Sequence, residues 1–152
     1  MDGPRASISR ALRRQQVIWL SSIRPDRRPH VLPVWFVWDG GSILLFSKPH
    51  AQKVRNLERD PAVMVAIGQP GPNFDVELVE GIGELEAVPT RDLMPESFVS
   101  KYCALMARGG ITPDAYAAVY SQPIRIHPRR WLDWGGPGWT SRPGHPAFRD
   151  SR

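Results

Sequence analysis

Six polar residues within a stretch of ten could together bind an anion. They are Ser47, Lys48, Gln52, Lys53, Arg55 and Asn56. Their ammonium, guanidinium, amide and hydroxyl groups are donors that phosphate oxygens accept. If a strand ends at Lys48 and a helix begins near Ala51, the free amides of the helix N-terminus lie beside them and attract the same anion. A surface helix with cations in water would contain the same residues, so this stretch alone indicates only an unspecified phosphate.

A second feature lies just before this stretch, where Pro33, Val34 and Trp35 occur within a long apolar run. Proline donates no hydrogen bond in a sheet, so the strand that contains Pro33 is expected at a sheet edge or at a bulge. Its unpaired backbone N–H and C=O groups could then contact a flat aromatic ligand. For Trp35, Phe36 and Trp38 the alternative is ordinary packing in a core or an interface. A ring system with a phosphate tail would fit both features.

The sequence contains no familiar grouping of catalytic side chains. It has no Ser-His-Asp grouping, no HExxH motif and no Walker-type loop, and its four histidines are scattered. A histidine metal site or acid–base pair is therefore not expected. The only cysteine, Cys103, is interpreted as core filler. The acidic residues of one segment fit a solvated sheet face; they are Glu77, Glu80, Glu84 and Glu86. We expect no catalytic side chain and no metal, and chemistry that resides in a cofactor.

The apolar pattern predicts the elements that position these residues. Strands are expected at 17–24, 29–38, 42–48, 62–68, 75–88 and 123–134, and helices at 9–16, 51–59, 95–109 and 112–121. Ser9 is the expected N-cap of the first helix and Thr112 that of the last. Asp39 and Gly40 indicate a hairpin with a type I′ turn. Consecutive antiparallel strands close most readily into a small barrel, so the sequence predicts a mainly β fold with peripheral helices.

Length and composition favour one domain. A chain of 152 residues with 41% hydrophobic content can bury one core. We expect a single domain over residues 1–152, with a core at about 9–134 and a flexible tail at 135–152. No run is long and apolar enough for a membrane span, and the N-terminus has no apolar signal core. A cytoplasmic protein without a membrane partner is therefore expected.

The net charge of +5 is unevenly distributed. Lys plus Arg outnumber Asp plus Glu by 11 to 5 in residues 1–60 and by 6 to 2 in residues 123–152, whereas acids lead by 8 to 3 in between. Basic ends suit an anionic ligand, although a solvated surface can show the same pattern. A pI of about 10.0 and six tryptophans would also suit a binder of single-stranded nucleic acid. Because most tryptophans lie in apolar strand contexts, no nucleic-acid partner is expected.

Three motifs in order carry a resemblance to a known family. They are RPDRRPHVLPVWFVWDG at 24–40, SKPHAQKVRN at 47–56, and PESFVSKYCALMARGGITPDAYAAVYSQPIRI at 95–126. With them the chain resembles, from about Val17 to Trp134, the flavin and deazaflavin oxidoreductases related to pyridoxamine 5′-phosphate oxidase. Within these it most resembles the coenzyme F420-dependent branch. Two positions depart from the family pattern: Arg27 replaces a turn glycine, and Gln52 replaces a basic residue or threonine.

The resemblance implies a six-stranded antiparallel split barrel of the FMN-binding type. It also implies a homodimer with a cofactor groove at the subunit interface. The strand with Pro33, Val34 and Trp35 would contact the ring of the cofactor through its main chain. The positions that match the phosphate site of the family are Ser47, Gln52, Lys53 and Asn56, with Arg55 as a further participant and Lys48 beside them.

The implied activity is that of an oxidoreductase that uses coenzyme F420 to transfer a hydride to a small conjugated or unsaturated substrate. FMN also carries a phosphate, so an FMN-dependent oxidase or reductase is the nearest alternative. An alternative of another class is a non-catalytic protein that binds a flavin, F420 or haem, with His30 or His50 as the axial ligand of the haem. The sequence contains no recognisable substrate motif.

Overall fold

The computed structural model describes residues 6–68 and 76–134. The predicted tail at 135–152 lies outside these residues. The elements are α1 (Ala6–Arg14), β1 (Ile18–Ile23), β2 (Pro29–Val34), β3 (Phe36–Trp38), β4 (Ile43–Ser47), α2 (Gln52–Arg59), β5 (Ala62–Gly68), β6 (Val76–Leu85), α3 (Thr90–Leu93), α4 (Glu96–Arg108), α5 (Pro113–Val119) and β7 (Gln122–Trp134). None of the helices in the described ranges is long and apolar enough to cross a membrane.

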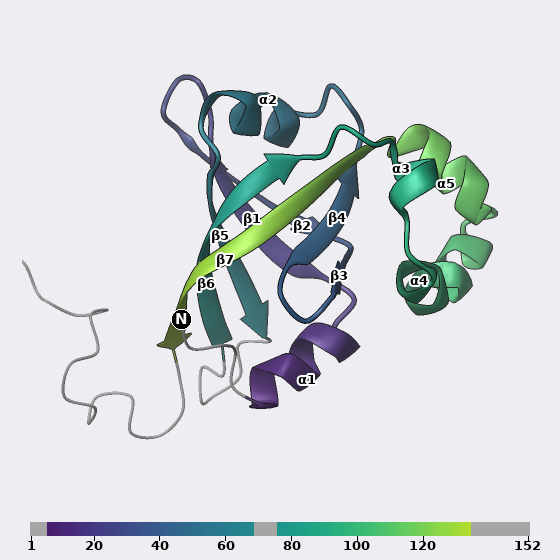
Figure 1. Ribbon diagram of the computed structural model, residues 1–152, viewed down its shortest axis with the longest axis horizontal. Coiled ribbons are helices and arrows are strands. Elements are labelled where there is room, and N and C mark those ends of the chain that lie inside the picture. Colours follow the sequence, from purple (N-terminus) through teal and green to yellow (C-terminus); the bar gives the residue numbers. More distant parts are fainter. Residues whose placement is uncertain (1–5, 69–75, 135–152) are drawn as a thin grey trace, which may run out of the picture.

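The seven described strands form one sheet in the order β2-β1-β5-β6-β7-β4-β3, and every pair in it is antiparallel. The two ends of this order, β2 and β3, are separated in the chain by a single residue, Trp35. The sheet must therefore curl until its ends approach each other, as Figure 1 shows. The predicted split-barrel fold is confirmed. It has seven strands rather than six because the run at 29–38 divides at Trp35.

The helices lie outside the curled sheet (Figure 1). Helix α1 lies at one end of the sheet and α2 at the other, while α3, α4 and α5 lie together at one side. Helix α1 begins at Ala6, so the prediction of Ser9 as its N-cap is wrong. Ile8 and Leu12 are buried one turn apart, and the packing of this face extends the helix beyond Ser9. Thr112 is the N-cap of α5, as predicted, and its hydroxyl accepts a hydrogen bond from the Ala115 amide at 3.2 Å.

Two apolar clusters hold these elements together. The first lies inside the curled sheet and includes Phe36, Leu45 and Ile126. The second lies between β3–β4 and the helices α4 and α5, and includes Leu44 and Phe46. Strand β4 is buried along its whole length because its alternating side chains enter both clusters. Helix α4 is thereby fixed against the end of the sheet that carries β3.

Close packing against β6 fixes the position of α2. Val54 and Leu57 are buried, and a Cβ atom added to Gly83 would lie 2.7 Å from the Leu57 Cδ2 atom. Glycine at this position therefore lets the helix approach the sheet. The helix ends at Arg59, just before Pro61, as predicted. Lys53 and its polar neighbours are thus held on a rigid element.

The two turns that flank β2 and β3 differ from expectation in their backbone. In the hairpin after β3, Gly40 has a φ of 103°, whereas neither Asp39 nor Gly41 has a positive φ. This pattern suits a type II′ turn, so the predicted type I′ turn is wrong. The Asp39 carboxylate accepts hydrogen bonds from the Gly41 and Ser42 amides at 2.9 and 2.6 Å. In the turn before β2, Arg27 has a φ of 65°, the conformation that glycine favours.

Candidate cofactor-binding site

The chain is interrupted where it passes from one end of the sheet to the other. Strand β2 ends at Val34, which pairs with Ile18, and β3 begins at Phe36, which pairs with Leu45. Trp35 belongs to neither strand. Because β2 has a partner on one side only, the position of Pro33 at a sheet edge agrees with the prediction. On the side away from β1, no described strand covers the backbone at Pro33–Trp35.

A pocket of about 240 Å³ lies against this interruption. Its lining is mainly apolar and aromatic and contains one cation. The lining residues are Pro33, Val34, Trp35, Phe46, Lys53, Leu105, Met106, Ile111, Tyr116 and Tyr120. One wall thus comes from the predicted ring-binding residues, and the opposite wall comes from α4, α5 and the turn between them. The shape and chemistry suit a flat apolar group that has a negative charge at one end.

Stacked aromatic rings build the wall formed by α4 and α5. The ring centroid of Trp35 lies 4.6 Å from that of Tyr102 with an interplanar angle of 8°, and 5.7 Å from that of Tyr116 with an angle of 16°. Tyr116 in turn stacks on Tyr120 at 4.5 Å. Burial, followed by the neighbouring tyrosines, raises the pKa of Tyr116 far above its usual value. The Tyr116 phenol is therefore neutral and keeps its proton.

The positive charge at the pocket is not compensated by acidic residues. Lys53 lines the pocket, and the Lys48 ammonium lies 5.9 Å from the ring centroid of Tyr120. Burial lowers the pKa of Lys53, and the charge of Lys48 lowers it further. Within residues 6–68 and 76–134, neither lysine forms an ion pair with a carboxylate. Two neighbouring ammonium groups without a carboxylate suit a site that binds an anion.

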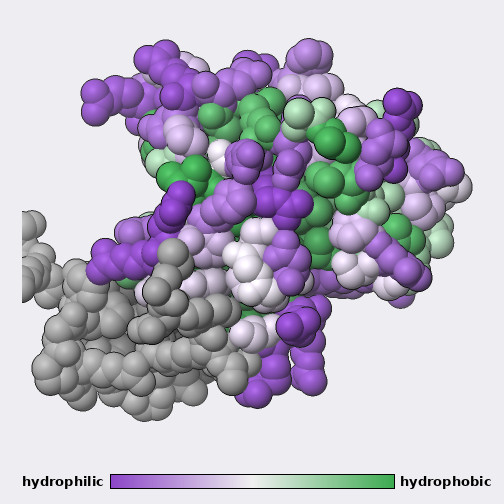
Figure 2. Space-filling model, in the orientation of Figure 1, coloured by the Kyte–Doolittle hydropathy of each residue, from purple (hydrophilic) through white to green (hydrophobic). Residues whose placement is uncertain are grey.

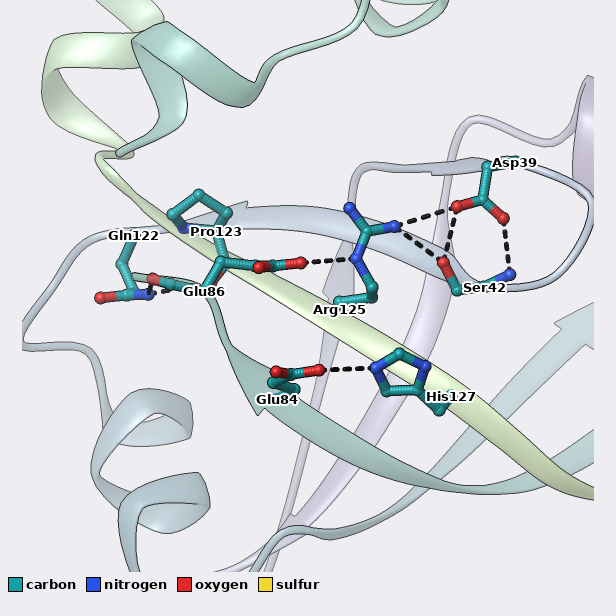
Figure 3. Close-up of polar contacts among 8 residues, drawn as sticks. All are labelled: Asp39, Ser42, Glu84, Glu86, Gln122, Pro123, Arg125 and His127. Carbon is teal, nitrogen blue, oxygen red and sulfur yellow. Dashed lines mark hydrogen bonds and ion pairs between the residues drawn. The ribbon is translucent and has the colours of Figure 1, made fainter. Parts of the chain in front are cut away.

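Arg125 shows how this chain compensates a cation that has a structural role (Figure 3). Its guanidinium lies between Glu86, at 2.5 Å, and Asp39, at 2.9 Å, and also donates to the Ser42 hydroxyl at 2.8 Å. These contacts tie β7 to the β3–β4 hairpin and to the end of β6. Arg125 thus has two carboxylate partners, whereas Lys48 and Lys53 have none among the described residues. This difference suits a role for the two lysines in binding an anion.

A chain of side-chain hydrogen bonds runs along α2 and ends on β1. Arg55 donates to the side-chain Oε1 atom of Gln52 at 2.7 Å, and the side-chain amide of Gln52 donates to the Oδ1 atom of Asn56 at 2.8 Å. The side-chain amide of Asn56 in turn donates to the Ser22 hydroxyl at 2.9 Å. Asn56 and Ser22 are buried. Arg55 also donates to the His50 carbonyl at 2.8 Å, and no side chain caps the N-terminus of α2. These bonds hold α2 so that its free first amides lie beside Lys48 and Lys53.

Two further polar residues belong to this region, and the sequence assigned neither to the anion site, since His30 was considered only as a haem ligand. His30 lies on β2, and its pKa is lowered by burial and then by the charges of Lys53 and Arg24. The Nδ1 atom of His30 and the Nε atom of Arg24 are buried and have no hydrogen-bond partner among the described residues. An unpaired guanidinium N–H and an unpaired imidazole nitrogen near Lys53 fit a phosphate group, which accepts several hydrogen bonds at once. Alternation along β2 could have indicated His30, since Ser22 is its register partner.

The structure separates the predicted site residues into three groups. Pro33, Val34, Trp35 and Lys53 line the pocket, and Lys48 lies at its edge. Gln52, Arg55 and Asn56 do not line the pocket and form the hydrogen-bonded chain of α2. Ser47 is fully buried, and its hydroxyl donates to the Lys48 carbonyl at 3.0 Å. No group of metal-ligating side chains occurs among the described residues.

Two interpretations of other residues are wrong. Cys103 is exposed on α4 and is not core filler, since the buried face of α4 contains Phe98, Tyr102 and Met106. The interpretation as a solvated face is wrong for Glu77, which is 3% exposed and faces the interior together with Val79. It agrees with the side chains of Glu80 and Glu84, which are 43% and 58% exposed, while Glu86 pairs with Arg125.

This architecture is similar to that of known proteins. Residues 5–135 match the family described as pyridoxamine 5′-phosphate oxidase. A structure described as an F420 reductase is 26% identical, with 85% of this chain and 98% of that chain covered and a TM-score of 0.63. A conserved hypothetical protein from Mycobacterium tuberculosis is 25% identical, with 89% and 86% covered and a TM-score of 0.69.

A more distant structure shares the fold alone. The haem storage protein HutZ from Vibrio cholerae is 14% identical, with 85% of this chain and 93% of that chain covered and a TM-score of 0.63. No curated protein matches the chain. The family match covers the half-barrel, the interrupted strand and α2 together. The chain therefore belongs to the pyridoxamine 5′-phosphate oxidase family of split-barrel proteins.

Proposed function

We propose that the protein is an oxidoreductase that uses coenzyme F420 to reduce a small conjugated or unsaturated substrate. The observation that carries the proposal is the pair Lys48 and Lys53, which lack carboxylate partners among the described residues and lie where an apolar pocket meets the interrupted strand. The 26% identity to a structure described as an F420 reductase supports the choice of cofactor. The several anionic groups of F420 also suit a chain with a net charge of +5.

In this proposal the residues of the site have separate tasks. Lys48, Lys53 and the first amides of α2 bind the phosphate, and His30 and Arg24 donate hydrogen bonds from the same side. The backbone of Pro33–Trp35 contacts the edge of the ring, and the apolar wall excludes water. The cofactor, when bound, supplies the hydride chemistry. The Tyr116 phenol stays protonated and donates a hydrogen bond to a polar atom of the bound ligand.

Separate titrations of the purified protein with F420 and with FMN test the proposal, with cofactor fluorescence as the readout. Saturable F420 binding, followed by oxidation of reduced F420 on addition of an enone or a quinone, is the expected result. Tight FMN binding with none for F420 would replace F420 by FMN. Binding of neither cofactor would refute both.

The haem-binding alternative requires a different kind of contact between the protein and its ligand. It needs a histidine as axial ligand, and the protein offers His30 at the cationic region and His50 at an exposed position before α2. A Soret band on titration with haem that disappears in His50→Ala or in His30→Ala would favour it. Absence of such a band, together with F420 binding, is the expected result.

We also propose that two copies of the chain pair through the outer face of β1 and β2. Trp19 and Val31 are 50% and 53% exposed, and the side chains of Trp19, Val31 and Pro33 share this face because Trp19 pairs with Pro33 and Ser21 with Val31. Figure 2 shows hydrophobic surface, in green, between hydrophilic side chains on the face that it draws. Since Pro33 also lines the pocket, a second copy on this face would extend the pocket into a groove.

Sedimentation velocity tests the pairing. The wild-type protein is expected to sediment as a dimer, and Val31→Glu as a folded monomer, because a carboxylate at the centre of an apolar interface loses its water without gaining a partner. Arg28→Glu, at an exposed position outside this apolar face, is the matched control and should remain dimeric. A monomeric wild-type protein at tens of micromolar would refute the pairing.

A further inference from the structure

The first residue of β3 has backbone groups that no strand satisfies. Phe36 pairs with Leu45 on one side and lies at the edge of the sheet on the other. Its N–H group donates to the Tyr102 hydroxyl oxygen at 2.8 Å, and its C=O group lies 2.8 Å from the same hydroxyl. Tyr102 comes from α4, 66 residues along the chain, and is fully buried. A side chain thus takes the place of the neighbouring strand at the split in the barrel.

The donors and acceptors at this point match in number. The Tyr102 hydroxyl has one proton, and both the Gln16 carbonyl and the Phe36 carbonyl lie 2.8 Å from it. Lys101 supplies the second donor, because its ammonium donates to the Phe36 carbonyl at 3.1 Å and to the Leu12 carbonyl at 3.3 Å. Every polar group at the split is then satisfied. Two neighbouring residues of α4 therefore fix the N–H and the C=O group of Phe36 in the interrupted strand.

We propose that Tyr102 is a positioning residue for the ring of the cofactor. Its hydroxyl holds Phe36, its ring stacks on Trp35 at 4.6 Å, and the backbone of Pro33–Trp35 forms the adjoining wall of the pocket. The strand is anchored by β1 before this wall and by Tyr102 after it. Anchors on both sides keep the backbone groups in place before the ring arrives, which lowers the cost of binding. This inference rests on the proposed function, since it assigns Pro33–Trp35 to the ring.

Packing alone does not require the hydroxyl. The ring of Tyr102 already stacks on Trp35 and contacts Phe98 at a centroid distance of 4.6 Å, and phenylalanine would preserve both contacts. What phenylalanine would lose is the link to Phe36. Tyr102→Phe therefore separates the positioning role from the packing role. Phe98→Leu is the matched control, because it weakens the same cluster and leaves the link intact.

The experiment compares the dissociation constant of whichever cofactor binds, F420 or FMN, for the wild-type protein and both variants over a range of salt concentrations. Tyr102→Phe should raise the constant about 10-fold, the effect of about one lost hydrogen bond to a positioned group. The salt dependence should stay that of the wild type, because the phosphate contacts are unchanged. Phe98→Leu should lower the melting temperature and leave the constant within about twofold. A wild-type constant in Tyr102→Phe, or an equal rise in both variants, would overturn the proposal.

A second measurement keeps the proposal testable if Tyr102→Phe does not fold. Amide hydrogen exchange of the wild-type protein should show the Phe36 amide protected as strongly as amides in the centre of the sheet, although it lies at an edge. Cofactor should increase the protection further. Fast exchange at Phe36 would refute the link itself. If the wild-type protein binds neither cofactor, the proposed function fails, and slow exchange at Phe36 would then show that the link exists without a ring to position.

Discussion

Replacement of Lys53 by methionine should affect stability and binding in opposite directions. Methionine keeps the length and most of the apolar contacts of the side chain but removes its charge. In the folded protein this charge is half-buried, lies near Lys48 and has no carboxylate partner within the described residues, so burial and like charge lower the pKa of Lys53. The charge is therefore a cost to folding. We expect its removal to leave the free energy of unfolding unchanged or to raise it by up to about 1 kcal/mol.

The same replacement should weaken binding of the cofactor. A hydrogen bond from a charged group to a phosphate oxygen contributes about 1.5–3 kcal/mol, which corresponds to a rise of roughly 10- to 150-fold in the dissociation constant. The salt dependence of binding should also decrease, since one cation fewer contacts the anion. Fluorescence titration of F420 or FMN measures both quantities, and thermal unfolding measures stability. An increase of up to about 4 °C in melting temperature would accompany the loss of affinity.

A control on the same helix separates this site from general electrostatics. Arg59→Met also removes one positive charge from α2, but Arg59 is exposed at the C-terminal end of the helix and does not line the pocket. Its dissociation constant should stay within about twofold of the wild-type value. If Lys53→Met binds the cofactor as tightly as the wild-type protein, or if Arg59→Met weakens binding equally, the assignment of the anion site is wrong. A large loss of stability in Lys53→Met would show that the charge has an unrecognised partner.

Three further changes test other parts of the structure. Burial lowers the pKa of Lys101 to about 8, so between that pH and about 10.5 the unfolded chain binds a proton that the folded chain does not. Lys101 should therefore make stability rise with pH in this window, by less than about 3 kcal/mol because the side chain is only half-buried. Since the pKa of Lys53 is also lowered, Lys101→Met should reduce the rise measured by thermal unfolding without removing it. Asn56→Ala leaves the buried Ser22 hydroxyl without its donor and should cost about 1–3 kcal/mol in urea unfolding, whereas an unchanged midpoint would contradict the hydrogen-bonded chain. Arg27→Gly should stabilise the protein by roughly 0.5–1 kcal/mol because Arg27 has a φ of 65°, and Arg28→Gly, at an adjacent position without a positive φ, should not.

Local pattern was sufficient for the half of the site that is contiguous in the chain. The run from Pro29 to Ser47 contains its own strand pattern, its hairpin glycine and the proline that marks an edge, and the spacing of Val54 and Leu57 predicts α2. These features depend on neighbours a few residues away. The break at Trp35 was missed, because an aromatic residue within an apolar run fits a continuous strand equally well. The type of the turn after β3 was also wrong, since glycine at positions 40 and 41 does not show which of the two takes a positive φ.

The other half of the site depends on how distant elements pack, which no local pattern states. Helical spacing shows that Phe98, Tyr102 and Met106 share a face, but it does not show that this face covers β3 and β4. The same limit explains Ser47. Its position at the end of the strand, just before a basic helix, suggested a hydroxyl open to an anion, whereas both faces of β4 are covered, one by the interior of the barrel and the other by α4 and α5. A free hydroxyl for phosphate was therefore expected where the structure has a buried one.

The way in which the barrel is closed determines whether the site can exist. The chain must pass from the first to the last strand of the sheet order within one residue. If the whole run 29–38 paired with β1 on one side and with β4 on the other, the barrel would be closed and the backbone of Pro33–Trp35 would be covered. Closure by the Tyr102 hydroxyl satisfies Phe36 alone and leaves the preceding residues open to the pocket. A side chain can do this because it supplies one donor and one acceptor at a single point, whereas a strand supplies them along its whole length. The pocket is therefore a consequence of closing the barrel from a helix.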